Sequence, residues 1–185
     1  MLPSVAGRAN SGAPLSADVS PALLPMDQFA VGDRVIKSPL TWKANDFDEW
    51  GRGLGIGVVV EAPFRLEEGS VDVRWPCGRC FEDGYGLLPA PTAAELEILE
   101  SLLDDLESIE SLYTGTRTPY RSSMARGDLA ATLVMLAKNG LAQPFNYREQ
   151  EGAWVQIELT DSTNMEQVWF QATPGAKDCL YVHSR

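Results

Sequence analysis

The chain has 185 residues, of which 44% are hydrophobic, and a formal net charge of −11. This apolar content excludes a disordered chain, and the length allows one large domain or two small ones. Twelve acids and eight bases precede Thr92, and fourteen acids and seven bases follow from there. Nucleic acids and anionic membranes need a basic face, so the charge predicts neither as a partner. It favours a basic protein partner, or simply solubility.

The sequence predicts a cytoplasmic protein. No run of about 20 apolar residues is present that would span a membrane, and residues 1–26 lack the layout of a secretory signal. Three cysteines, an odd number, fit a reducing compartment better than a disulfide framework. Residues 1–26 are rich in Ala, Ser, Pro and Gly without periodicity, so we expect a flexible leader.

Residues 27–90 have the pattern of short strands separated by turns. Three stretches have strand character: residues 34–37 (RVIK), 58–60 (VVV) and 71–75 (VDVRW). A period of two is typical of a half-buried strand, and an unbroken apolar run of a strand covered on both faces. Glycines between residues 51 and 57 and a turn at residues 76–79 separate the strands. Because closure removes exposed edges, we predict a small β-barrel.

The order of motifs in this region resembles one known family. Gly32-Asp33-Arg34-Val35 is followed by a Trp-bearing loop, Gly-x-Gly-x-Val-Val, Val-x-Val-x-Trp and a glycine turn. This order resembles the mind-bomb (MIB) type of SH3-like domain, over about a third of the chain. The resemblance implies an SH3-like barrel that binds peptide segments of partner proteins, with Trp42, Trp75 and Tyr85 at or near the groove. The family's Trp-x-Trp-Gly core is here Trp42-Lys43-Ala44-Asn45.

Residues 91–113 are predicted to form one acidic amphipathic helix. Thr92 and Glu95 have the spacing of a capping box. An apolar stripe at helical spacing runs from Leu96 to Ile109, and we expect it to dock on the barrel or on the C-terminal unit, or to pair with a partner helix. The opposite face is acidic and either solvated or bound to a basic partner. The acids proposed for that contact are Glu100, Asp104 and Glu107.

Residues 114–121 are predicted to form a linker, and residues 122–185 a small α+β unit. A helix is expected from Met124 or Asp128 to Lys138, closed by Asn139-Gly140. Strands are expected around residues 145–147, 154–159, 167–172 and 179–182, joined as an antiparallel meander. The predicted fold class is therefore α+β, with an N-terminal SH3-like barrel, a connecting helix, and a C-terminal helix plus meander.

Cysteine, histidine and glycine motifs offer weak candidates for chemistry. Cys77 and Cys80 form a C-x-x-C that with Cys179 and His183 could hold zinc. In a predicted strand the last two lie about 13 Å apart, so a plain hairpin turn is favoured at Cys77–Cys80. The glycines between residues 51 and 57 precede a strand rather than a helix, which excludes a phosphate loop. We predict no cofactor and no bound metal.

The loop between the first two predicted strands combines aromatic and acidic side chains. Its aromatics are Trp42, Phe47 and Trp50, and its acids are Asp46, Asp48 and Glu49. Such a mixture is typical of protein interfaces, although these rings could instead line the barrel core. The leading hypothesis is a non-catalytic module that binds a protein or peptide through this loop, Trp75 and Tyr85. The alternatives are an immunity-type inhibitor of a basic toxin or nuclease, and a small zinc-dependent or redox enzyme.

Overall fold

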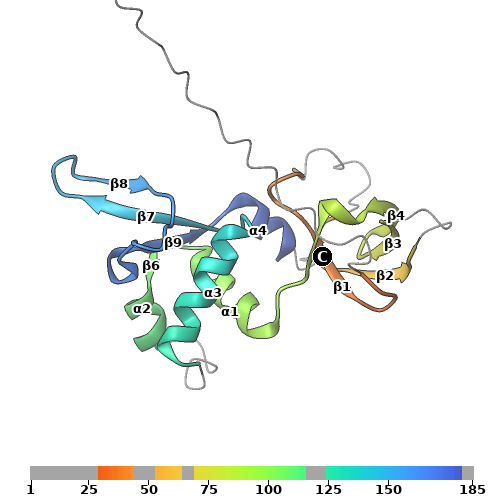
Figure 1. Cartoon of the computed structure of the whole chain (residues 1–185), viewed down its shortest axis with the longest axis horizontal. Coiled ribbons are helices and arrows are strands. Elements are labelled where there is room, and N and C mark those ends of the chain that lie inside the picture. Colours follow the sequence, from red (N-terminus) through yellow and green to blue (C-terminus); the bar gives the residue numbers. More distant parts are fainter. Residues whose placement is uncertain (1–28, 44–52, 64–68, 116–123, 181–185) are drawn as a thin grey trace, which may run out of the picture.

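A computed structural model describes residues 29–43, 53–63, 69–115 and 124–180, which form two adjoining units (Figure 1). The N-terminal unit contains β1 (Arg34–Lys37), β2 (Gly57–Glu61), β3 (Ser70–Trp75), β4 (Gly78–Asp83), the 3-10 helix η3 (Gly84–Gly86) and β5 (Leu87–Pro89). The C-terminal unit contains α1 (Ala93–Leu102), β6 (Glu107–Ser108), α2 (Ile109–Thr114), α3 (Arg126–Lys138), β7 (Ala142–Arg148), β8 (Ala153–Gln156), the 3-10 helix η4 (Met165–Gln167), β9 (Trp169–Ala172) and α4 (Pro174–Cys179). The predicted α+β class is confirmed.

The N-terminal unit is one antiparallel sheet with the strand order β4-β3-β2-β1-β5. The stretches RVIK, VVV and VDVRW form β1, β2 and β3 as predicted. Pro76 and Cys77 form the tight turn between β3 and β4, where Trp75 is opposite Gly78, and the rest of the C-x-x-C stretch begins β4. Among the described residues β4 and β5 end the hydrogen-bonded order, so a closed barrel is not shown.

This sheet is nevertheless strongly curled. Lys37 on β1 forms an ion pair with Glu82 on β4, although β2 and β3 lie between these strands. In a flat sheet three strand spacings would separate β1 and β4 by about 14 Å. The concave side holds a small core, which consists of Val35, Val59, Val71, Val73, Trp75 and Leu87.

The second sheet has the order β6-β9-β7-β8, which differs from the predicted meander. β9 pairs with β7 instead of β8, with Phe145 opposite Trp169. The predicted strand 179–182 is also wrong at its start, because Cys179 ends the helix α4. The Thr173 side chain caps that helix and Pro174 occupies its first turn, which suits the fixed φ of proline. Residues 181–185 lie outside the described part of the chain.

The predicted helix 91–113 is two helices separated by the short strand β6. The capping box is confirmed, since Thr92 and Glu95 exchange both hydrogen bonds. The first helix ends at Leu102, and its cap residue Leu103 is followed by Asp104 and Asp105, which are poor helix formers. The Asp105 carboxylate accepts from the Leu106 N–H at 2.8 Å, and β6 then pairs with β9. A distant strand thus interrupts a locally favourable helix.

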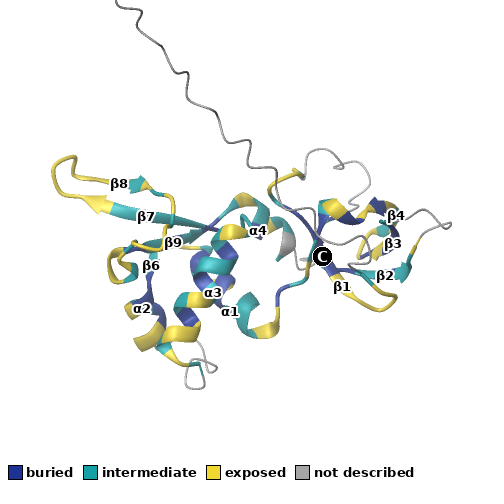
Figure 2. Ribbon diagram, in the orientation of Figure 1, coloured by how far each residue is buried: buried dark blue, intermediate teal, exposed yellow. Residues whose placement is uncertain are grey.

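The two units share an apolar interface through β1. The side chains of Val35 and Ile36 are both fully buried but face opposite sides of the sheet. Val35 packs inside the curl, whereas Ile36 belongs to the core formed by α1, α2, α3 and β9, together with Leu99, Leu133 and Phe170. Figure 2 shows the buried positions of β1 and of the helices that contribute to these cores. The predicted connecting helix is therefore part of the C-terminal unit.

The predicted helix ending at Lys138 is confirmed as α3, and Gly140 follows it with a φ of 73°. None of the described helices has the length and apolar character needed to cross a membrane.

Candidate functional site

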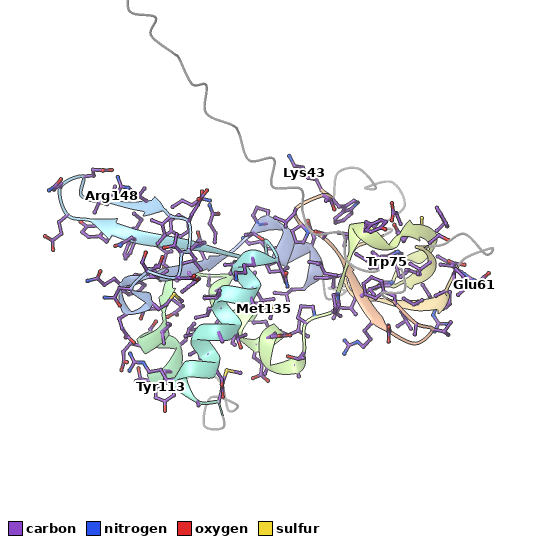
Figure 3. All side chains as sticks on the ribbon, in the orientation of Figure 1. Lys43, Glu61, Trp75, Tyr113, Met135 and Arg148 are labelled. Carbon is purple, nitrogen blue, oxygen red and sulfur yellow. The ribbon has the colours of Figure 1, made fainter. Side chains whose placement is uncertain are left out.

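A groove of about 940 Å³ lies where the two units meet, and we call it the junction groove. The loop after β1 supplies Leu40, Trp42 and Lys43 on one side. The start of β7, the segment after β8 and the helix α4 supply the other side, with Ile157 and Leu159 among the lining residues. Figure 3 labels Lys43 at the edge of this region, where its side chain extends outward. Both units are therefore needed to form the groove.

Two glycines of the C-terminal unit allow the loop after β1 to approach closely. A Cβ atom at Gly175 would lie 2.4 Å from Cβ of Pro39, and one at Gly140 would lie 2.7 Å from Cδ2 of Leu40. The loop before β2 is also attached, because the Gly55 N–H donates to the Asp178 carbonyl at 2.8 Å. Backbone packing therefore sets the width of the junction groove.

A Gly175→Ala substitution is expected to lower the free energy of unfolding by about 1–3 kcal/mol, because the added methyl group overpacks the contact with Pro39. Gly127→Ala is the matched control: Gly127 is also helical, but a Cβ there meets nothing within 4 Å, so we expect it to be neutral or stabilising. Urea denaturation measures both variants. Equal stabilities would show that the Pro39 contact does not fix the junction.

Most of the groove lining is apolar, with a few polar groups placed among it. The apolar contacts come from Trp42, Leu40 and several other side chains, which are Pro39, Pro144, Ile157, Leu159 and Pro174. The charged lining residues are Lys43, Lys138, Glu158 and Asp178, so the lining is neutral. An apolar surface with a few polar anchors is the usual composition of a binding site.

A buried ion pair lies beneath the Trp42 loop. Lys37 and Glu82 are 8% and 7% exposed, and Glu82 also accepts a hydrogen bond from the Trp75 Nε1–H at 3.1 Å. A Cβ at Gly53 would lie 3.0 Å from the Lys37 side chain and 3.4 Å from the Trp42 ring. Gly53 therefore packs against both Lys37 and Trp42, and the ion pair supports the aromatic wall of the groove.

The C-x-x-C stretch lies at the β3–β4 hairpin, with Cys77 in the turn and Cys80 in β4. Cys77 is exposed and Cys80 half-buried, and both thiols are free. Arg79 between them donates from Nε to the buried Asp72 carboxylate at 2.6 Å. This hydrogen bond raises the pKa of Arg79 above its ordinary value, and the nearby charges of Asp72 and Glu61 act in the same direction. The Arg79 contact thus ties β4 to β3 beside the turn.

The candidate zinc ligands Cys77, Cys80, Cys179 and His183, for which no bound metal is predicted, are only partly described. Within the described residues no group of three or more His, Cys, Asp or Glu side chains could hold a metal ion. Cys179 ends α4 rather than lying in a strand, so the strand spacing that argued against zinc does not apply to it. His183 lies outside the described residues.

The predicted aromatic site is divided by the structure. Trp42 is half-buried and lines the junction groove, whereas Tyr85 is 46% exposed on η3 and is not among the lining residues. Trp75 is only 2% exposed and packs with the valines of the concave core instead of lying beside Trp42 or Tyr85; its contact with a partner stays a prediction. The remaining predicted loop residues, Asp46, Phe47, Asp48, Glu49 and Trp50, lie outside the described residues.

The acids predicted to lie on one helix face are separated. Glu100 is exposed near the end of α1, Asp104 is exposed in the following turn, and Glu107 is half-buried in β6. They therefore do not form the continuous helical face that was predicted to contact a basic partner.

Sequence reasoning missed an aromatic cluster on the second sheet. The Trp154 ring lies 5.2 Å from the rings of both Tyr147 and Trp169, at interplanar angles of 62° and 60°. Tyr147 and Trp154 are 47% and 40% exposed and are directly opposite each other on β7 and β8. The sequence signal that could have indicated this cluster is the pair of aromatic residues, Tyr147 and Trp154, on either side of the turn at Gly152.

Comparison with known proteins found no relative of this chain. No protein-family model, no curated protein and no solved structure matches the chain.

Proposed function

We propose that the chain is a non-catalytic protein-binding module that holds an extended peptide segment of a partner in the junction groove. The observation that carries this proposal is the position of Trp42, a half-buried indole on the wall of an apolar groove between two units. Tryptophan is enriched among the residues that contribute most to binding, especially in well-packed central pockets.

The composition of the groove supports a peptide as the ligand. Its apolar side chains can contact side chains of the peptide, and the amides of Gln143 and Gln156 can donate to and accept from a peptide backbone. The lining itself is neutral, but the chain carries a net charge of −11, which favours the approach of a segment from a basic protein.

We propose further that the N-terminal unit is an SH3-like domain of the MIB type with a barrel completed by approach of β4 to β5. The curl that brings Lys37 to Glu82 supports this, as does the single short 3-10 helix between β4 and β5. In that family the barrel binds peptide segments, which agrees with the proposed function.

The test is a Trp42→Ala substitution. Peptides selected from a displayed random library on the parent chain should bind the variant at least about tenfold more weakly, since truncating a central tryptophan commonly costs that much or more. Tyr85→Ala is the control, because Tyr85 is an exposed aromatic of the same unit outside the groove. Titration calorimetry gives the affinities. Unchanged affinities for a folded Trp42→Ala variant would refute the groove as the site.

The inhibitor hypothesis rests on charge, and the separation of Glu100, Asp104 and Glu107 removes the continuous acidic face that supported it. It stays a prediction, and its signature is an affinity that falls steeply as salt is raised.

A further inference from the structure

We propose that the free edge of β8 is a second docking site, where a partner adds an extended strand with an apolar centre and a lysine or arginine at each end. Adding a strand to an exposed sheet edge is a recurring mode of peptide recognition. This inference goes beyond the junction groove, because it uses the outer backbone edge of β8 and an aromatic face; it shares only Gln143, Gln156 and Glu158 with the groove lining.

Among the residues that the structure describes, no strand pairs with the outer backbone edge of β8. β8 ends the order of the second sheet, and Ala153, Trp154 and Gln156 are exposed. The Ile157 N–H donates to the Pro144 carbonyl at 3.0 Å. Hydrogen bonding alternates along an antiparallel strand. The backbone N–H and C=O of Val155 therefore also point toward β7, whereas those of Trp154 and Gln156 point away from β7. These four groups offer a partner strand two donors and two acceptors.

An aromatic face adjoins this edge. The face of the second sheet opposite the helices carries only aromatic and glutamine side chains at its positions in β7, β8 and β9, which are Gln143, Phe145, Tyr147, Trp154, Gln156, Trp169 and Gln171. An added strand would place alternate side chains beside Trp154 on this face. Figure 1 shows that the β7–β8 hairpin projects away from the helices and from the N-terminal unit. The incoming side chains on this face should therefore be apolar or β-branched.

Acids at both ends of β8 specify the ends of the partner strand. Glu149 and Glu151 lie in the turn before β8, where Arg148 pairs with Glu151 at 2.9 Å. Glu158 and Asp161 follow β8 and are exposed. This arrangement complements a strand with basic residues at both ends. It also disfavours a second copy, because antiparallel pairing of two β8 strands would bring Glu151 of each copy near Glu158 of the other.

The test compares Gln156→Pro with Gln156→Ala in the full chain. Proline at residue 156 removes the outward backbone N–H but no hydrogen bond to β7, and proline is tolerated in edge strands. Alanine removes the same glutamine side chain but keeps the backbone N–H. The probe is a displayed library of random twelve-residue peptides selected on the parent chain. We expect a class of selected peptides with alternating apolar residues and basic ends that binds Gln156→Pro about tenfold more weakly than Gln156→Ala.

A second measurement does not depend on the variants. With such a peptide bound, hydrogen exchange of the Trp154 and Gln156 amides should slow, whereas Val155 and Ile157, already bonded to β7, should change little. Three outcomes would overturn the proposal: no selected peptide distinguishes the two variants, the two outward amides keep exchanging at the free rate, or the parent chain dimerises through β8 in a manner that Gln156→Pro abolishes. Peptides of the junction groove should lose affinity equally with both Gln156 variants, so the two proposals can fail separately.

Discussion

Replacing Glu82 by alanine is expected to lower the free energy of unfolding by about 3–5 kcal/mol, the usual cost of removing one member of a buried ion pair. The Lys37 ammonium would lose its carboxylate partner at a site where both side chains are less than a tenth exposed. The Trp75 indole N–H would lose its acceptor at the same time. Urea denaturation followed by tryptophan fluorescence measures the change.

Two further variants separate the contribution of the buried Lys37–Glu82 ion pair to stability from other effects of the substitution. Glu151→Ala removes an exposed partner of Arg148 and should change the stability by less than about 1 kcal/mol. The double variant Lys37→Met with Glu82→Leu replaces both charges by apolar groups, so it should be clearly more stable than Glu82→Ala alone. If Glu82→Ala were no more costly than Glu151→Ala, the pair would not support the curled sheet.

Ile36→Ala should weaken both units, whereas Val35→Ala should weaken mainly the first. Both side chains are fully buried, and truncating either is expected to cost on the order of 2–4 kcal/mol. They differ in where the cavity forms, because Ile36 belongs to the core of the C-terminal unit and Val35 to the concave core of the first sheet. The adjacent positions therefore form a matched pair.

Hydrogen exchange, read segment by segment, distinguishes the two variants. In Ile36→Ala protection should fall in β1–β5 and also in α3 and β9, whereas in Val35→Ala α3 and β9 should keep most of the parent's protection. Protection of α3 that is unchanged by Ile36→Ala would mean that the two units are stabilised independently.

Much of the local structure could be predicted because its signals are local. The alternation in VDVRW defines β3, and the Thr92–Glu95 spacing defines the start of α1. Gly140 ends α3 because its positive φ suits a helix terminus. The same alternation also indicates the burial of Trp75, because Val71, Val73 and Trp75 share one face of the strand.

The remaining features depend on contacts between residues far apart in the chain. The break after Leu102 is stabilised by pairing of β6 with β9, about sixty residues later, and no local pattern encodes that pairing. The junction groove likewise requires Pro39 to pack on Gly175. Aromatic character drew attention to Trp42 from the sequence, but only the packing of the two units places it in a groove.

The bond from the Gly55 N–H to the Asp178 carbonyl has a practical consequence for protein engineering. Since it joins two main-chain groups, replacing the Asp178 side chain leaves it intact, whereas Gly55 must be kept because its φ of 75° favours glycine. The residues lining the junction groove other than Pro39, Gly140 and Gly175 can thus be varied while the spacing of its walls is retained, which makes this chain a suitable scaffold for evolving new recognition specificities.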